Sequence, residues 1–365
     1  MAGSTLGNIF RITTWGESHG KGIGVVVDGC PAGLTLCEED IQKYLNRRKP
    51  GQSKFTTPRK EDDAVEILSG VFEGKTTGTP ISMVVWNTNQ NSKDYSKIAS
   101  YYRPGHADYG FDEKYGFRDY RGGGRSSGRE TIGRVAAGAI AIKILNEMGI
   151  TFTTYTKSIG PVVVDEASYD FTEINNNALY MPNAKAAGEA ALYLEECLAN
   201  RNSSGGTVEC VVTGLPVGLG DPVFEKLDAN LAKAIFSIGA VKGFEIGDGF
   251  KVSSATGLTN NDAFGIKDGK VTKETNHSGG TLGGMSDGSP LVFRAAIKPT
   301  PSIASTQHTI NQAKEEIEIN ITGRHDPVIV PRAVVVVEAM AALSILDLLF
   351  SNMTAKLDSI VDFYK

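Results

Sequence analysis

The sequence predicts an α+β fold in which antiparallel β-sheets pack against helices. The strand-like runs in the early part of the chain follow one another without a helix between them, whereas a doubly wound fold alternates strands with helices. The segments with helical periodicity are long and apolar, as expected of helices covered on most sides. The chain of 365 residues is long enough to bury a large core.

The predicted strands are short runs rich in β-branched and aromatic residues, whereas the predicted helices repeat apolar residues with helical spacing. The strands span residues 10–14, 23–28, 64–71, 81–86, 151–164, 207–213, 241–246 and 291–297. The helices span residues 131–148, 184–200, 227–238 and 333–350.

Two of these helices have features beyond their periodicity. The first is alanine-rich and apolar on nearly all sides, and the pattern Ser127-x-x-Glu130 before it predicts a capping box at its start. The last is the most apolar segment of the chain, but it includes Glu338 and Asp347. We therefore expect a buried helix there rather than a membrane span.

The chain is expected to form a single domain over residues 1–365. No internal repeat, low-complexity tract or change of composition marks a linker. Long polar, glycine-rich stretches lie between predicted elements at residues 87–125, 257–289 and 299–324. Loops of this length in a compact chain are usually functional.

The composition is that of an ordinary soluble protein, with 41% hydrophobic and 22% charged residues and a formal net charge of −5. An acidic chain does not fit a general nucleic-acid-binding protein, which usually has a basic domain. The N-terminus lacks a basic segment followed by an apolar run, so no signal peptide is predicted. The 4 cysteines have neither zinc-site spacing nor a Cys-x-x-Cys pair, which indicates reduced thiols in a cytoplasmic protein without a metal site.

A cluster of arginines around a glycine triplet stands out against this acidic background. Arginine occupies positions 118, 121, 125, 129 and 134, with glycine at 122–124. Cations this close together require full solvation or a polyanion to offset their repulsion. The glycines let backbone approach a ligand, and the following helix start offers N–H groups and the positive end of its dipole. The segment predicts a site for a small, multiply charged anion; the alternative is a solvated basic face.

Most of the 5 histidines lie in loops marked by glycine, arginine or proline. His19 lies between Ser18 and a glycine directly after a predicted strand, where it can carry a proton. His106 lies in a Pro-Gly loop, and His277 begins a glycine-rich run. A structural or solvent-exposed role is the simpler interpretation of His19 and of His106 alone, whereas a mobile loop and a ligand site are equally plausible for the His277 run. Only the conjunction of these motifs indicates catalysis.

Two further motifs contain cations. The run Lys298-Pro-Thr-Pro-Ser302 follows a predicted strand, and its ammonium and hydroxyl groups suit a bound phosphate. Residues 324–326 place arginine, histidine and aspartate in consecutive positions. Consecutive side chains face different partners, and neither the spacing nor the neighbours fit a metal site.

The chain resembles the chorismate synthase family over essentially its whole length. Three ordered segments carry the resemblance, and they start with Gly-Glu-Ser-His-Gly, Gly-Arg-Ser-Ser-Gly-Arg-Glu and Arg-His-Asp-Pro. They lie at residues 16–31, 124–139 and 324–339. The resemblance implies long core helices sandwiched between antiparallel β-sheets, and assembly as a homotetramer.

The resemblance also implies a reaction, the last common step of the shikimate pathway to the aromatic amino acids. 5-Enolpyruvylshikimate 3-phosphate loses phosphate and a ring proton in an anti-1,4 elimination that gives chorismate. Reduced FMN (FMNH2) is required, although no net redox change occurs. This chemistry fits the arginine cluster, because guanidinium groups bind phosphates and carboxylates in bidentate pairs.

By the same resemblance, His19 acts near the reduced flavin and tunes its protonation. His106 donates a proton to the leaving phosphate, and Asp326 helps the flavin accept the ring proton or relays it. These residues are the expected catalytic group.

The expected binding residues form three sets. Arg129 and Arg134 are assigned to the substrate on charge grounds, and Ser18 is expected in the same set. Arg48 and Lys54 match positions that contact a pyridine-nucleotide phosphate in the family. The FMN contacts expected from the resemblance are Arg125, Ser126, Ser127, Gly239, Ala240, Gly283, Lys298, Pro299, Thr300, Pro301, Ser302 and Arg324.

The family includes members that reduce their own flavin with NADPH and members that depend on an outside reductant. This chain has no obvious extra insertion, which favours a separate flavin reductase. No nucleic-acid or membrane partner is expected. A second hypothesis is a non-catalytic binding or regulatory protein for a phosphorylated metabolite, which would need the arginines but no proton carriers. Nucleic-acid binding through the arginine loop would instead show a steep salt dependence.

Overall fold

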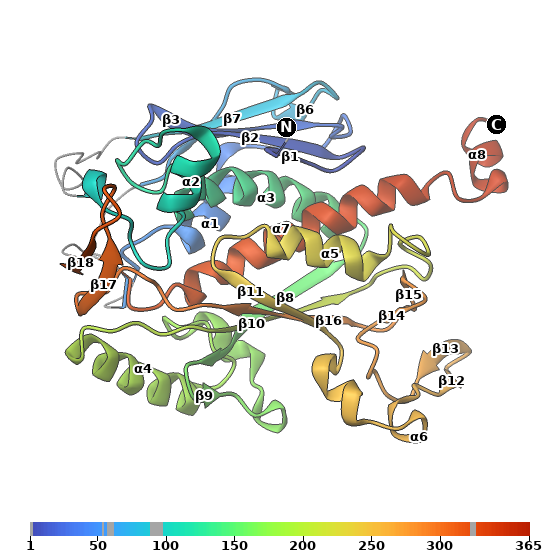
Figure 1. Cartoon of the computed structure of the whole chain (residues 1–365). Helices are drawn as coiled ribbons and strands as arrows, with labels where there is room; N and C mark the ends of the chain where they lie inside the picture. Colours follow the sequence, from blue (N-terminus) through green and yellow to red (C-terminus); the bar gives the residue numbers. More distant parts are fainter. Residues whose placement is uncertain (1–2, 53–54, 57–61, 88–97, 322–325) are drawn as a thin grey trace.

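The computed structural model describes residues 3–52, 55–56, 62–87, 98–321 and 326–365. Two five-stranded sheets enclose a double layer of helices (Figure 1). Every strand pairing within the two sheets is antiparallel. The predicted α+β class and the sandwich of core helices between antiparallel sheets are therefore confirmed.

The first sheet is built from the N-terminal part of the chain. Buried and exposed residues alternate along β2, which places Ile12 and Thr14 on the face toward the helices. Strand β3 lies in the middle of the sheet and is buried along most of its length. The strand order is β1 (Thr5–Leu6), β2 (Arg11–Gly16), β3 (Gly22–Asp28), β7 (Ile81–Trp86) and β4 (Val65–Ile67).

The second sheet is built from residues 151–297 and covers the other side of the helices (Figure 1). Its central strands pair over long registers, and the apolar residues of β10 and β16 that face the helices are fully buried. The strand order is β11 (Val241–Ile246), β16 (Leu291–Ile297), β10 (Gly206–Thr213), β8 (Thr151–Ile159) and β9 (Val162–Val163).

The helices between the sheets form two layers. Helix α3 contacts β2, β3 and β7 on one side and α7 on the other, and α7 contacts β8 and β10. Helices α1 and α5 lie beside them and contact α7 as well. Their bounds are α1 (Glu38–Arg48), α3 (Thr131–Glu147), α5 (Leu227–Phe236) and α7 (Val330–Asn352).

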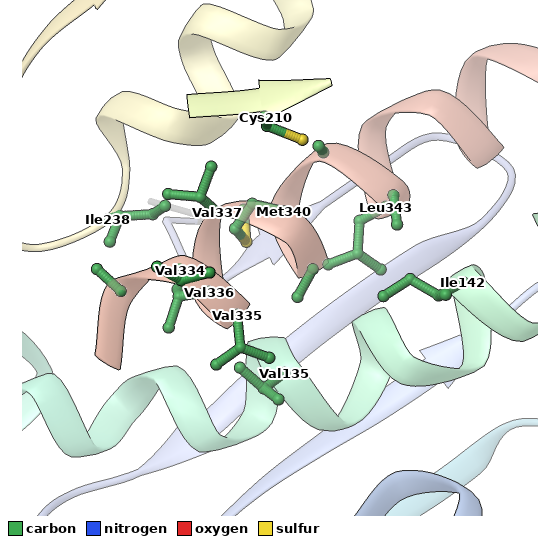
Figure 2. Packing of buried hydrophobic residues seen from close by; sticks show 14 of the residues in the cluster. Val135, Ile142, Cys210, Ile238, Val334, Val335, Val336, Val337, Met340 and Leu343 are labelled. Carbon is green, nitrogen blue, oxygen red and sulfur yellow. The ribbon is translucent and has the colours of Figure 1, made fainter. Parts of the chain in front are cut away.

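Helices α3 and α7 pack closely because small residues face one another. A Cβ atom added to Gly138 would lie 2.4 Å from the Cβ atom of Ala339, so the two backbones are nearly in contact at this point. Figure 2 shows Val335 of α7 directed toward Val135 of α3, and Cys210 of β10 on the opposite side of α7. The alanine-rich composition of α3 thus serves a close helix contact.

Helix α7 is long and apolar enough to cross a membrane by length and composition, but 83% of its most apolar stretch is buried inside the protein. Its two carboxylates have internal partners. Glu338 accepts hydrogen bonds of 2.9 and 3.0 Å from Arg47. Asp347 accepts the backbone N–H groups of residues 8, 9 and 10. Paired in this way, both charges are tolerated in the core, as the sequence predicts.

Some elements differ from the predicted ones. Residues 64–71 and 151–164 each divide at a turn into two strands, β4 with β5 and β8 with β9. Helix α1 was not predicted from the sequence. Its buried residues are Ile41, Leu45 and Arg48, and two apolar residues are too few for a recognisable helical periodicity. The glycine-rich stretches contain short elements without visible periodicity. These are β5 (Val71–Phe72), β6 (Lys75–Thr76), α2 (Asp108–Tyr115), α6 (Gly257–Asn260), β12 (Phe264–Lys267), β13 (Lys270–Lys273), β14 (Thr281–Leu282), β15 (Met285–Ser286), β17 (Thr306–Ile310) and β18 (Glu316–Asn320).

The remaining helices lie outside the core, which consists of two layers of helices between two sheets. Helix α4 (Ala184–Ala199) lies beyond the second sheet, and α8 (Leu357–Phe363) follows α7 at the C-terminus (Figure 1). All four cysteines are free thiols, as the sequence predicts.

Candidate active site

The glycine triplet lies against the first histidine motif. His19 is in the turn between β2 and β3 and is only 8% exposed. Gly122 has a φ of +112°, and a Cβ atom added to it would lie 2.7 Å from Cδ2 of the His19 ring. Only glycine fits here, because both its backbone conformation and the adjacent imidazole exclude a side chain.

Arg125 anchors the arginine segment to the end of β2. Its guanidinium donates to the carbonyl of Gly16 at 3.2 Å and to Oγ1 of Thr14 at 2.7 Å. It also lies 3.6 Å from the carboxylate of Glu130. Arg125 is therefore held in place by carbonyl, hydroxyl and carboxylate oxygens.

The predicted capping box does not form at the start of α3. Ser127 instead caps the short 3₁₀ helix at residues 128–130, where its Oγ atom accepts the backbone N–H of Arg129 at 3.3 Å. The Glu130 carboxylate accepts the Thr14 hydroxyl at 2.8 Å and the Arg134 Nε–H at 2.7 Å. The capping-box prediction was wrong because these tertiary partners take the glutamate away from the backbone.

Three segments expected to contact FMN lie next to one another. The position of a Cβ atom on Gly239 would be 4.0 Å from the carbonyl oxygen of Ser126. The backbone N–H of Lys298 donates to the carbonyl of Ala240 at 2.9 Å. The 125–127 segment, the 239–240 junction after α5 and the 298–302 turn after β16 therefore meet, although long stretches of sequence separate them.

His106 joins this group through the 298–302 turn. Its Nε2 atom lies 3.0 Å from the Ser302 hydroxyl. The Lys298 ammonium donates to the carbonyl of Gly105 at 2.7 Å, and Gly105 packs so closely on Pro301 that a Cβ atom would lie 2.7 Å from it. The loop of the second histidine and the lysine turn therefore form one unit.

The partners of His106 determine which ring nitrogen carries its hydrogen. Nδ1 lies 3.1 Å from the Pro104 carbonyl, which can only accept, so Nδ1 carries the hydrogen and Nε2 accepts from Ser302. Burial of the ring, and next the nearby Arg103 cation, lower the pKa of His106 from 6.5 to about 4, with Lys298 acting in the same direction. The imidazole is therefore neutral at pH 7 in the unliganded protein.

A buried network joins two arginines to one aspartate. The Asp63 carboxylate has no exposed surface and accepts from Arg48 at 2.6 Å and from Arg129 at 2.8 Å. Nε of Arg129 donates to Oδ1 of Asn87 at 2.8 Å. Burial lowers the pKa of Arg48, whose side chain is 2% exposed. One aspartate thus fixes two of the predicted binding arginines.

The third signature contributes Asp326, which is 9% exposed. Its carboxylate lies 2.5 Å from Nη1 of Arg332, and Nε of Arg332 donates to the carbonyl of Arg48 at 2.9 Å. Asp326 therefore lies near the end of α1 and its buried arginine. Arg324 and Lys54 lie outside the described residues.

Arg134 donates to two side-chain oxygens of the protein, one at the start of α3 and one just before the 239–240 junction. Its Nε atom pairs with Glu130, and its Nη1 atom donates to Oγ of Ser237 at 2.6 Å. The side chain connects α3 to the end of α5.

Gly283 lies at the opposite end of α5 from Ala240. The carbonyl of its neighbour Gly284 accepts the N–H of Leu227, the first residue of α5. The helix has 10 residues, so about 15 Å separates its two ends. His277 pairs with Asp248 at 2.7 Å. Within one chain, Gly283 therefore lies apart from the other residues expected to contact FMN.

Several residues of this site were not found from the sequence. Asp63, Asn87 and Arg332 form contacts with predicted residues, but none of them belongs to a motif with recognisable spacing. Asp63 has a positive φ of 46°, and no pattern in the sequence predicts this backbone conformation. Pairing between buried side chains depends on the path of the whole chain.

Fixed guanidinium groups, two largely buried histidines and glycine-lined backbone characterise an enzyme that binds a phosphorylated, multiply charged ligand. The family model for chorismate synthase matches residues 10–350. The chain is 78% identical to chorismate synthase of Agathobacter rectalis and 67% identical to that of Lachnospira eligens, in each case over 100% of both chains. A crystal structure of chorismate synthase is similar with a TM-score of 0.77 and 31% identity, over 98% of this chain and 97% of that one. The chain belongs to the chorismate synthase family and is a lyase.

Proposed function

We propose that the protein converts 5-enolpyruvylshikimate 3-phosphate to chorismate by anti-1,4 elimination of phosphate and a ring proton. The observation that carries the proposal is the convergence of the arginine segment with both histidine loops, in a chain of this family. Such a substrate has one phosphate and two carboxylates, and preorganised cations stabilise charge that develops on a departing phosphate.

Reduced FMN is the proposed cofactor, and features of the described residues fit it. Oγ1 of Thr300 is buried and has no hydrogen-bond partner among the described residues. Gly239 leaves space beside Ser126, and the Lys298 ammonium lies in the same turn as Thr300. Glycine-lined backbone, a hydroxyl donor and a lysine cation suit a flat ligand with a phosphate. Bound reduced FMN would supply electron donation to the substrate, and the flavin would not be oxidised over the whole reaction.

We propose roles for the two histidines that are the reverse of those expected from the sequence. His106 is hydrogen-bonded to Ser302, in the turn with the proposed flavin contacts, so it acts on the flavin side. The turn of His19 is connected through Asn87 to Arg129, so His19 acts on the leaving phosphate. The pH dependence of the bound flavin spectrum distinguishes the two: we expect His106→Gln to change it more than His19→Gln does.

Asp326 is proposed to hold or relay a proton at the edge of this site. The ion pair with Arg332 keeps its carboxylate in one orientation, and Arg332 is itself fixed on the backbone of α1. An aspartate oriented by a second residue suits proton transfer better than a freely rotating one.

We propose that a separate reductase supplies the reduced flavin. The guanidinium of Arg48 is buried and directed to Asp63 and to the carbonyl of Gly128, an arrangement that supports the site from behind rather than offering a surface to NADPH. Anaerobic turnover with chemically reduced FMN, compared with aerobic turnover with FMN and NADPH alone, tests this. Activity in the second assay would favour a chain that reduces its own flavin.

The protein is further proposed to be a cytoplasmic homotetramer without nucleic-acid or membrane partners. Large exposed apolar side chains between residues 217 and 282 support association with further copies. They are Val217, Val223, Phe224, Phe236, Phe250, Val252, Leu258, Phe264, Ile266, Val271 and Leu282. Light scattering of the purified protein measures the number of subunits, and a monomer at micromolar concentration contradicts the proposal.

The alternative of a non-catalytic binding protein is not favoured, because it leaves the histidines unexplained. The deciding experiment is anaerobic release of phosphate from 5-enolpyruvylshikimate 3-phosphate by the purified protein with reduced FMN. Ligand-induced thermal stabilisation without any phosphate release would support the alternative.

A further inference from the structure

Asn87 follows the last residue of β7, next to the turn that contains His19. Its backbone N–H donates to the carbonyl of Lys21 at 3.0 Å and extends the pairing of β7 with β3 by one residue. The position of Asn87 is therefore set by β3 and β7, which are buried along most of their lengths.

The carboxamide of Asn87 contacts three groups from two different segments. Nδ2 donates to the carbonyl of Glu17 at 3.0 Å and to the carbonyl of Gly20 at 2.9 Å. Oδ1 accepts the Nε–H of Arg129 at 2.8 Å. The chemistry fixes this orientation, because carbonyl oxygens can only accept and an arginine can only donate.

The Nδ2 and Oδ1 atoms of Asn87 contact segments with different roles. Residues 17–20 form the turn around His19, and the turn is closed by a hydrogen bond of 3.0 Å from the N–H of Gly20 to the carbonyl of Glu17. Arg129 is held by the buried Asp63 at 2.8 Å. One carboxamide thus connects the backbone around a proton carrier to a guanidinium that is already anchored in the interior.

We infer that Asn87 is a positioning residue that holds the His19 turn and Arg129 in one fixed relation. The inference rests on the proposed function for the roles of those two residues. His19 then meets a leaving group that Arg129 binds, and a small displacement between them costs much of the rate, because proton transfer requires hydrogen-bond distance.

Two substitutions at this position separate the two contacts. Asn87→Asp keeps an acceptor for Arg129 but loses both donors to the His19 turn. We expect kcat to fall roughly tenfold while KM for the substrate stays within about threefold. Asn87→Ala loses both contacts, so we expect kcat to fall and KM to rise, each by roughly tenfold.

Asn177 offers a matched control. Its Nδ2 atom also donates to two backbone carbonyls, of Glu173 and Met181, at 2.7 and 2.8 Å. We expect Asn177→Ala to lower Tm and leave both kinetic constants unchanged, as a purely structural contact would. Kinetics of Asn87→Asp within about twofold of the wild type, or an equal rise in KM for both Asn87 variants, would overturn the inference.

Hydrogen exchange tests the contact independently of the reaction. In the unliganded protein we expect faster amide exchange at residues 17–20 in Asn87→Asp than in the wild type, and unchanged exchange there in Asn177→Ala. Unchanged exchange at this turn in Asn87→Asp contradicts the inference. A wild-type protein that releases no phosphate contradicts the proposed function instead, so the two failures are distinguishable.

Discussion

The hydroxyl of Ser302 lies 3.0 Å from Nε2 of His106, although 196 residues separate the two in sequence. Together with the Pro104 carbonyl on Nδ1, this contact fixes both ring nitrogens and leaves the imidazole neutral. A half-buried, neutral histidine near the Arg103 and Lys298 cations responds strongly to an added negative charge. We therefore expect an anion bound beside the 298–302 turn to favour protonation of His106.

The first prediction concerns the pH dependence of stability. The folded protein holds the pKa of His106 at about 4, below its ordinary 6.5, so between these values the unfolded chain binds the proton and the folded chain does not. The contribution of this residue to stability is therefore lost as the pH falls through that window. We expect His106→Gln to reduce the loss of stability between about pH 7 and pH 5, measured by urea denaturation at each pH.

The matched control is His308, whose side chain is 85% exposed. His308→Gln should leave the same pH dependence unchanged. An identical loss of stability in wild type and His106→Gln would show that His106 is protonated equally easily in both states.

The second prediction concerns the glycine against His19. Gly122→Ala introduces a Cβ atom at 2.7 Å from the imidazole and places alanine at a φ of +112°. Displacement of the ring should lower kcat by roughly tenfold or more. Anaerobic phosphate release with reduced FMN measures the effect.

Gly110→Ala in α2 is the comparison, because nothing lies within 4 Å of the added atom. Alanine is also the better helix former by roughly 0.5–1 kcal/mol, so this variant should be at least as stable and as active as the wild type. Equal activity of the two variants would argue against a close role for His19.

The third prediction concerns the buried aspartate between two arginines. Asp63→Ala leaves Arg48 and Arg129 without their shared counter-ion in the interior. Breaking a buried ion pair from one side costs about 3–5 kcal/mol, which urea denaturation would detect as a lower midpoint. Asp28→Ala removes the exposed pair with Arg11, whose side chains are 46% and 50% exposed, and should cost less than about 1 kcal/mol.

The fourth prediction concerns the contact between the core helices. Gly138→Ala places a Cβ atom 2.4 Å from that of Ala339, and overpacking of this kind costs roughly 1–3 kcal/mol. The same substitution at Gly188 in α4 meets nothing within 4 Å and should be neutral or stabilising. If Gly138→Ala were as stable as Gly188→Ala, α3 and α7 could move apart without lowering the free energy of unfolding, which would contradict the prediction.

The sequence by itself determined the class of fold and most of the long elements. Apolar periodicity and β-branched runs are local patterns, so the strand at residues 81–86 occurs as predicted, and the helices predicted at residues 131–148 and 333–350 occur with small shifts at their ends. The glycine and arginine motifs likewise identified the residues around which the candidate site is built.

Only the tertiary structure decided which of these residues meet. It placed His106 on Ser302, joined two arginines through Asp63, and linked Arg134 to Ser237 at the end of α5. It also separated Gly283 from Ala240 by the length of α5. The physical reason is that periodicity reports only which side of an element is buried. The partner of a buried polar group depends on the path of the whole chain and on the requirement that each such group be satisfied.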